Sequence, residues 1–263
     1  DQRDLIVVEH RDDVTVSELL HRSRCSRVVS VEHVPIEVID HPNPNNPAKP
    51  AATVLLVRDG EHGLEVLMIR RGTAMAFGGV WAFPGGRIDE GDIDDATDAV
   101  SAARRAAVRE ALEEVALVVD ESSLVMWSHW LPPDNPSPRF STWFFVAPAT
   151  AAHAVVGIDG LEVVDHRWFT PAGALDAHRE GEIDLVPPTM VTLVQLGGVR
   201  TVDEAMAIAE PAYFATRFAS LPDGTDVCLW AGDAGYESSD PEAPGRRHRL
   251  VMQPGGWRYI AVD

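Results

Sequence analysis

The stretch Arg109-Glu110-Ala111-Leu112-Glu113-Glu114 decides the fold of this chain when it is read together with Phe83-Pro84-Gly85-Gly86 upstream. Glu110, Glu113 and Glu114 are spaced i, i+3 and i+4, so on a helix their carboxylates share one face within about one turn. Packing like charges this closely is destabilising, and a divalent cation that prefers oxygen ligands would remove the penalty. The stretch therefore predicts a metal site at the start of a helix, after a glycine turn. Taken alone, the three glutamates are also typical of a solvated, charged helix face.

Composition limits the classes of protein that this chain represents. Its 263 residues allow one large domain, or one domain with appendages. The formal net charge of −19 disfavours a surface for nucleic acid, although a bound metal still allows a small phosphorylated substrate. Cys25 and Cys228 lie far apart without metal-site spacing, which favours two reduced thiols in a cytoplasmic protein. We find no signal-peptide pattern and no apolar run long enough to span a membrane, so we expect no membrane partner.

The order of elements predicts an α/β fold. Residues 1–48 read as an N-terminal appendage and linker, ending in a Pro- and Asn-rich loop, and residues 49–263 read as the main domain with a C-terminal helical extension. A helix is predicted after Thr170, with this residue as cap and Pro171 at the first position. Strands mixed with helices, without regular βαβ alternation, favour a mixed sheet flanked by helices. The predicted strands are 53–58, 64–69, 124–127, 142–147, 163–169, 226–230 and 257–261, and the other predicted helices are 92–118, 191–196 and 202–209.

The run from Gly86 to Leu117 resembles the Nudix box, the signature of hydrolases that cleave a diphosphate linked to another moiety. Gly86 supplies the first glycine of the family pattern, and Arg109 to Leu117 supplies its second half. Asp92 stands where the pattern has its first glutamate, Ala116 replaces a glycine, and Ala111 is small at an apolar position. The resemblance implies a Nudix-type α/β/α sandwich.

The spacer between the two halves of the box, residues 93–108, is longer than in the family pattern. This split box looks like the Nudix subgroup of the peroxisomal coenzyme A diphosphatase. Residues 127–145, with their tryptophans and the Arg139-Phe140-Ser141-Thr142 segment, and Leu185-Val186-Pro187-Pro188-Thr189 resemble further patterns of that subgroup, as do Gly232, Asp233 and Tyr236 in a feature of unclear role.

The resemblance implies that Glu110, Glu113 and Glu114 hold Mg²⁺ or Mn²⁺ and act in catalysis. Arg109 is expected to orient a glutamate through a bidentate contact. Asp92 is read equally as a helix cap and as a catalytic residue. The family takes its general base from the box or from a later loop, and Glu162 is the candidate in the catalytic set.

For the remaining candidate site residues, the sequence leaves more than one role open. Asp159 and Asp165 are also considered for the general base, with an ordinary loop carboxylate as the alternative for each. Candidate substrate-binding residues are Arg70, Arg71, Arg139, Gly85 and Gly86; the arginines also fit exposed charges or a salt bridge. Aromatic residues that could stack on adenine, and that more often form core, are Phe77, Trp81, Trp127 and Trp130. His129 has no second ligand at metal spacing and is read as structural.

The resemblance implies metal-dependent hydrolysis of a pyrophosphate bond in a nucleoside diphosphate derivative, with coenzyme A or acyl-CoA as the favoured substrate. ADP-ribose, a dinucleotide or another nucleoside-diphosphate compound is the first alternative. A non-catalytic ligand-binding Nudix protein is the second, against which the complete set of glutamates argues. A homodimer is one of the oligomeric states that the sequence leaves open.

Overall fold

The computed structural model describes residues 46–73, 78–94, 96–134, 138–149, 156–158 and 160–262. The predicted appendage, residues 1–48, therefore lies almost wholly outside the described residues, as do Phe77 and Asp159.

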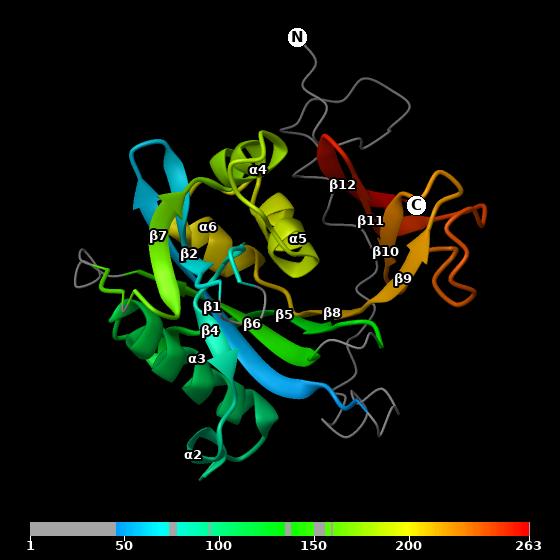
Figure 1. Cartoon of the computed structure of the whole chain (residues 1–263). Coiled ribbons are helices and arrows are strands. Elements are labelled where there is room, and N and C mark those ends of the chain that lie inside the picture. Colours follow the sequence, from blue (N-terminus) through cyan, green and yellow to red (C-terminus); the bar gives the residue numbers. More distant parts are fainter. Residues whose placement is uncertain are drawn as a thin grey trace.

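The described chain is built around a mixed eight-stranded sheet with the order β3-β2-β1-β6-β5-β8, in which β4 also pairs with β1 and β7 with β2 (Figure 1). The β1–β6 and β5–β8 pairs are parallel, and the other pairs of this sheet are antiparallel. Its strands are β1 (Lys49–Gly60), β2 (Gly63–Arg71), β3 (Trp81–Ala82), β4 (Gly85–Arg87), β5 (Val125–Leu131), β6 (Phe140–Pro148), β7 (Val163–Phe169) and β8 (Ala212–Ala215).

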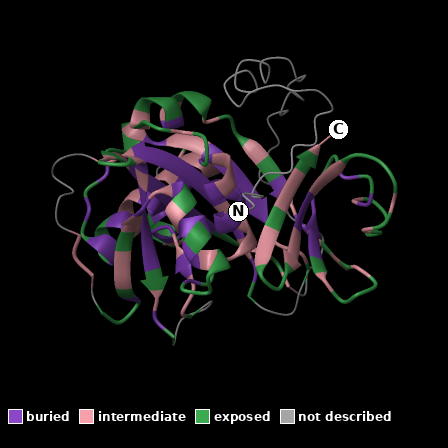
Figure 2. Ribbon diagram, turned by 90° about the horizontal axis from the view of Figure 1, so that it is seen from above, coloured by how far each residue is buried: buried purple, intermediate pink, exposed green. Residues whose placement is uncertain are grey.

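Helices cover both faces of this sheet, as predicted (Figure 1). Val54 and Leu56 of β1 pack on the side of α3, whereas Leu55 and Val57 pack on the side of α4–α6, because successive side chains of a strand point to opposite faces. Figure 2 shows the buried residues gathered in the strands between these layers. The predicted α/β/α sandwich with a mixed sheet is confirmed. The helices are α2 (Glu90–Ile93), α3 (Ala99–Val115), η3 (Glu121–Ser123), α4 (Pro171–Arg179), α5 (Pro187–Gln195) and α6 (Val202–Ile208).

Alanines let α3 lie close to the sheet. Ala103, Ala107 and Ala111 recur at every fourth position and are fully buried against strands β1 and β6. This packing accounts for the small residue at position 111, because a larger side chain would push the helix away from the sheet.

The predicted helix start at Thr170 is confirmed. Its Oγ1 accepts a hydrogen bond from the Gly173 N–H at 3.1 Å, and Pro171 occupies the first turn of α4.

The prediction of a C-terminal helical extension is correct only for α4–α6. After α6 the chain adds β8 to the main sheet and then forms a four-stranded antiparallel sheet from β9 (Arg217–Ser220), β10 (Asp226–Leu229), β11 (Arg247–Gln253) and β12 (Gly256–Val262). Aromatic rings join the two sheets: Trp130 of β5 stacks on Phe214 of β8 at 3.9 Å, and the Trp230 ring, next to β10, stands edge-on to Trp130 at 5.7 Å. The shared aromatic core explains why this segment forms strands.

Helix α3 ends at Ala116, which has a φ of 55° and lies in the left-handed region. Its N–H donates to the Leu112 carbonyl at 3.0 Å, and the Leu117 N–H donates to the Ala111 carbonyl at 3.1 Å. Such a helix end favours glycine, which the family pattern has at this position, because a Cβ is strained there.

We expect Ala116→Gly to raise the free energy of unfolding by about 1 kcal/mol, because glycine relieves the left-handed strain. Urea unfolding of the purified protein measures the change. Ala107→Gly is the control inside the same helix, and it is expected to lower stability by more than about 1 kcal/mol, because glycine disfavours the helix and the change also removes a fully buried methyl group. A lower stability of Ala116→Gly would contradict the explanation.

Candidate functional site

The three glutamates of the box lie in the last two turns of α3, so the prediction that they lie at the start of a helix is wrong. The alanine-rich spacer extends the helix on its N-terminal side, where the Asp98 side chain caps it by accepting from the Ser101 N–H at 2.8 Å. The carboxylates therefore lie toward the negative end of the helix dipole, which disfavours negative charge. This placement strengthens the physical need for a nearby cation.

Glu114 is the buried member of the set, with 5% of its surface exposed. Its Oε2 accepts a hydrogen bond from the Gly85 N–H at 2.8 Å, and its Oε1 lies 3.7 Å from Arg71 Nη1. Burial raises the pKa of Glu114 to about 7, against the opposing effects of these two contacts. The charges of Glu110 and Glu162 raise the pKa further, so both lie near this carboxylate.

The glycine turn leaves room for these glutamates. A Cβ on Gly86 would collide with the Glu110 carboxylate, and a Cβ on Gly85 would collide with the Ala52 carbonyl oxygen. Burial also raises the pKa of Glu110. Both polar groups of Gly85 are occupied, because its N–H binds Glu114 and its carbonyl accepts from Arg71 at 3.2 Å. The Gly85 N–H therefore holds Glu114 in place, and a substrate contact of Gly85 stays a prediction. Gly86 provides space for Glu110.

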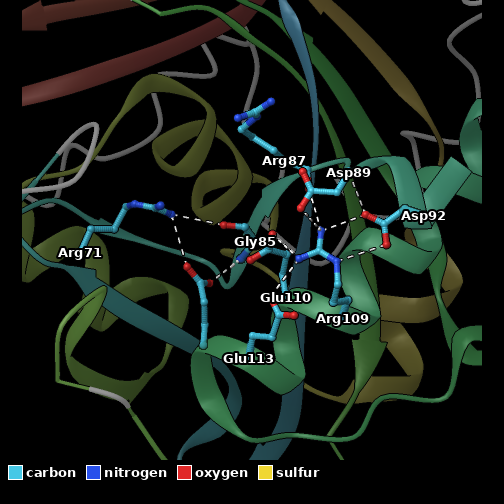
Figure 3. A network of polar contacts seen from close by, with 9 residues as sticks. Arg71, Gly85, Arg87, Asp89, Asp92, Arg109, Glu110 and Glu113 are labelled. Carbon is cyan, nitrogen blue, oxygen red and sulfur yellow. Dashed lines mark hydrogen bonds and ion pairs between the residues drawn. The ribbon is translucent and has the colours of Figure 1, made fainter.

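Arg109 connects the carboxylates, as Figure 3 shows. Its Nη1 donates to Glu110 Oε1 at 2.8 Å and to Glu113 Oε2 at 2.9 Å. Its Nε and Nη2 donate to the two carboxylate oxygens of Asp92 at 3.2 and 2.9 Å. The bond to Asp92 is the main reason that the pKa of Arg109 is raised. The expected orienting role of Arg109 agrees with these contacts.

Asp92 is buried and serves both Arg109 and its own helix. Its Oδ2 accepts from the Asp89 N–H at 2.9 Å, which forms a capping box at the start of α2. Of the two readings given to Asp92, helix capping is the one seen. Asp89 was missed in the sequence, although two aspartates three residues apart are a signal of this box.

The carboxylate oxygens of the three glutamates are suitable ligands for a hard cation, but in the structure these side chains bind other partners. Within the described ranges, no group of three or more His, Cys, Asp or Glu side chains is placed to hold a metal. Glu110 and Glu113 both bind Arg109, while Glu114 faces Gly85. The Glu113 side chain is 58% exposed and can turn, so Mg²⁺ or Mn²⁺ would be held by these oxygens after exchange with Arg109.

The three candidate arginines for phosphate have different surroundings. Arg70 is exposed at the end of β2, and Arg71 is turned inward to Gly85 and Glu114. Arg139 is 3% exposed and donates to the carbonyls of Pro132, Pro133 and Asn46 at 2.8–3.0 Å. Its Nη1 also lies 3.4 Å from Asp134 Oδ1, which is the salt bridge named as the alternative, and a substrate contact of Arg139 stays a prediction.

The candidates for the general base lie in different surroundings. Glu162 is exposed, and the neighbouring strand end brings it near Glu114, since the Gly72 N–H donates to the Glu162 carbonyl at 2.8 Å. Asp165 lies along β7, opposite Arg70, and its Oδ1 accepts from the His166 N–H. Asp159 is outside the described residues.

The tryptophans belong to the core rather than to an open stacking site. Trp81 stands edge-on to Phe169 at 5.5 Å, and the Trp127 indole donates to Gln195 at 2.9 Å. Trp81, Trp127 and Trp130 are each 5% exposed or less. His129 is buried, stacks on Trp143 at 4.1 Å and has its pKa lowered to about 4 by burial, which agrees with its structural reading.

The comparisons with known proteins agree with this fold. A family model described as NUDIX domain matches residues 47–187. An acyl-coenzyme A diphosphatase, NUDT19 of Xenopus laevis, is 34% identical over 86 residues, which cover 31% of this chain and only 22% of that relative. The crystal structure of a NUDIX hydrolase from Alicyclobacillus acidocaldarius is 23% identical to this chain and aligns with it at a TM-score of 0.56. The alignment covers 63% of this chain and 98% of that one, so the two proteins share a fold.

Fold and site together define a Nudix-type hydrolase architecture. This chain belongs to the NUDIX domain family, whose hydrolases act on phosphorus-containing anhydrides. No helix of the described residues is long and apolar enough to cross a membrane.

Proposed function

We propose that this protein hydrolyses the pyrophosphate bond of coenzyme A or an acyl-CoA, with Mg²⁺ or Mn²⁺ as cofactor. The products would be a 4′-phosphopantetheine species and adenosine 3′,5′-bisphosphate. The observation that carries the proposal is the set of three glutamates gathered beside the Gly85–Gly86 turn, with Glu114 buried against it.

The metal would be held by Glu110, Glu113 and Glu114. When bound, such an ion polarises a phosphoryl oxygen and lowers the pKa of a bound water. In the structure, Arg109 keeps Glu110 and Glu113 together by pairing with both. Asp92 in turn holds Arg109 through two hydrogen bonds, so the position of Arg109 beside these two carboxylates is fixed.

Glu162 is the general base that we propose. It is exposed to solvent and lies near enough to Glu114 for its charge to raise the pKa of that group. A carboxylate in this position accepts the proton of the attacking water, while the new P–O bond forms and the P–O bond to the leaving phosphate breaks.

Two observations favour a CoA-type substrate. The long spacer, residues 93–108, resembles the split box of the coenzyme A diphosphatase subgroup, and its residues 99–108 form the N-terminal part of α3. The second observation is the partial match to the Xenopus laevis acyl-coenzyme A diphosphatase.

We further infer that residues 49–263 form one domain. Strand β8 pairs with β5 of the main sheet, and one hydrophobic cluster includes Leu55 of β1 together with Trp230 and Leu250 of the C-terminal segment. A cooperative unfolding transition, with no separate transition for the C-terminal sheet, would support this boundary.

A substrate panel with product identification by mass spectrometry tests the proposed function. Coenzyme A, an acyl-CoA, ADP-ribose and a dinucleoside polyphosphate are each incubated with Mg²⁺ or Mn²⁺. We expect the CoA compounds to be cleaved to the two products named above, and Glu113→Gln to lose turnover. Cleavage of ADP-ribose but not CoA would defeat the CoA assignment, and unchanged turnover of Glu113→Gln would defeat the metal-carboxylate mechanism.

A further inference from the structure

Arg71 occupies an unusual place at the end of β2. The register of β2 against β7 shifts between Arg70 and Arg71, which marks a bulge, and bulges next to functional sites redirect side chains. The backbone of Arg71 is held on both sides, because its N–H donates to the Val80 carbonyl at 3.1 Å and its carbonyl accepts from the Gly79 N–H at 2.8 Å. The direction of the Arg71 side chain is therefore determined by the fold.

The Arg71 side chain points toward the Glu114 carboxylate and Gly85 (Figure 3). Its Nη1 lies 3.2 Å from the Gly85 carbonyl and 3.7 Å from Glu114 Oε1, while the Gly85 N–H binds the other oxygen of Glu114. One guanidinium group thus contacts both the turn and the glutamate that the turn holds. Within the described chain Arg71 is the cation paired with Glu114.

The inward direction argues against a direct contact between Arg71 and substrate phosphate. Only 19% of the Arg71 side chain is exposed, and its Nε is buried without a hydrogen-bond partner among the described residues. The adjacent Arg70 is exposed instead.

We propose that Arg71 is a positioning residue that acts through Glu114: it holds the carboxylate and the Gly85 carbonyl in one fixed arrangement, so that Glu114 is oriented to bind a divalent cation. The inference rests on the proposed function for its link to turnover. Its link to metal binding is tested separately, on the metal-free protein.

The test compares Arg71→Gln and Arg71→Lys with the wild type and with Arg179→Ala. Arg179 is a matched control, because it makes an exposed ion pair with Asp176 on α4. Calorimetric titration with Mn²⁺ measures the affinity, and steady-state kinetics on the cleaved substrate measure kcat and KM. Thermal melting confirms that each variant is folded.

We expect Arg71→Gln to weaken Mn²⁺ binding and to lower kcat by about 10- to 100-fold each, the usual range for residues that orient metal ligands. KM should stay within about twofold, because transition-state stabilisation is lost without loss of substrate binding. Arg71→Lys keeps the charge and should recover part of the Mn²⁺ affinity, and Arg179→Ala should match the wild type.

A raised KM with unchanged kcat and Mn²⁺ affinity would assign Arg71 to the substrate and overturn the proposal. A fall in melting temperature with unchanged Mn²⁺ affinity would reduce Arg71 to a structural role and overturn it as well. If the wild type cleaves no diphosphate, the proposed function fails, while the Mn²⁺ titrations still decide the role of Arg71. If Arg71→Gln does not fold, Arg71→Lys decides: Mn²⁺ affinity and kcat both equal to those of the wild type would overturn the proposal.

Discussion

Glu114→Gln is expected to lower kcat roughly a thousandfold, the equivalent of about 4 kcal/mol of the several kcal/mol that a catalytic metal supplies. The glutamine removes the negative charge but keeps the shape of the side chain, and its amide oxygen can still accept from the Gly85 N–H. Steady-state kinetics with saturating Mg²⁺ measure the loss. Glu121→Gln, on the exposed helix η3, is the control and should retain full turnover.

The same substitution should leave the protein folded and change how its stability depends on pH. Burial raises the pKa of Glu114 from 4.5 to about 7 in the folded state. Between these values Glu114 keeps its proton in the folded state and loses it in the unfolded chain, so Glu114 contributes a loss of stability as the pH rises through this window. The buried His129, whose pKa is lowered to about 4, contributes a gain of stability over much of the same range, so the profile of the metal-free wild type is the sum of both effects. The contribution of Glu114 is roughly 3 kcal/mol, from about 1.4 kcal/mol per pKa unit.

Urea unfolding without metal at a series of pH values measures this effect. The stability of Glu114→Gln relative to the wild type should rise with pH across the window, because the variant lacks the loss that Glu114 contributes. Glu110, His129 and His248 contribute to both profiles. Equal pH profiles for wild type and variant would mean that the buried carboxylate is not the titrating group.

Asp233→Ala is expected to destabilise the protein by about 3–5 kcal/mol, the usual cost of breaking a buried ion pair from one side. The Asp233 side chain is 0% exposed and accepts from Arg249 Nε at 2.7 Å and Nη2 at 2.6 Å. It also accepts from the N–H groups of Gly235 and His248, both at 2.8 Å. Removing it leaves the buried guanidinium without its anion. Chemical denaturation measures the loss.

The double variant Asp233→Ala/Arg249→Met separates the ion pair from general packing. Replacing both partners removes the unpaired charge, so the double variant should be more stable than Asp233→Ala alone. A double variant that is less stable, by the sum of the two single losses, would show that the two residues act independently.

Patterns confined to neighbouring residues predicted the structure well. The strands around Leu55 and Val66, the helix cap at Thr170 and the carboxylates that share a face of α3 all follow from spacing along the chain. The core role of the tryptophans and the structural role of His129 follow from residue type. These features depend on local backbone geometry and on hydrophobic burial, which a sequence reports directly.

The contacts that the sequence does not predict join residues far apart in the chain. Gly85 is bound to Glu114, 29 positions away, and Arg139 donates to Asn46, 93 positions away. No spacing rule predicts such pairs, because the sheet order determines which loops meet. The sequence does not predict strands β9 and β11 of the C-terminal sheet for a similar reason, because the aromatic residues of this segment form a core only with Trp130 and Phe214.

By itself, the amino-acid sequence determined the family, the sandwich of helices on a mixed sheet, and the glutamate-bearing helix with its arginine, because these features are written in short-range spacing. Only the tertiary structure decided that Glu114 is the buried carboxylate, that Arg109 holds Glu110 and Glu113, and that Arg71 turns inward while Arg139 donates to backbone carbonyls. The physical reason is that burial, pairing of charges and the direction of a side chain arise from contacts between elements, and those contacts exist only when the sheet has assembled.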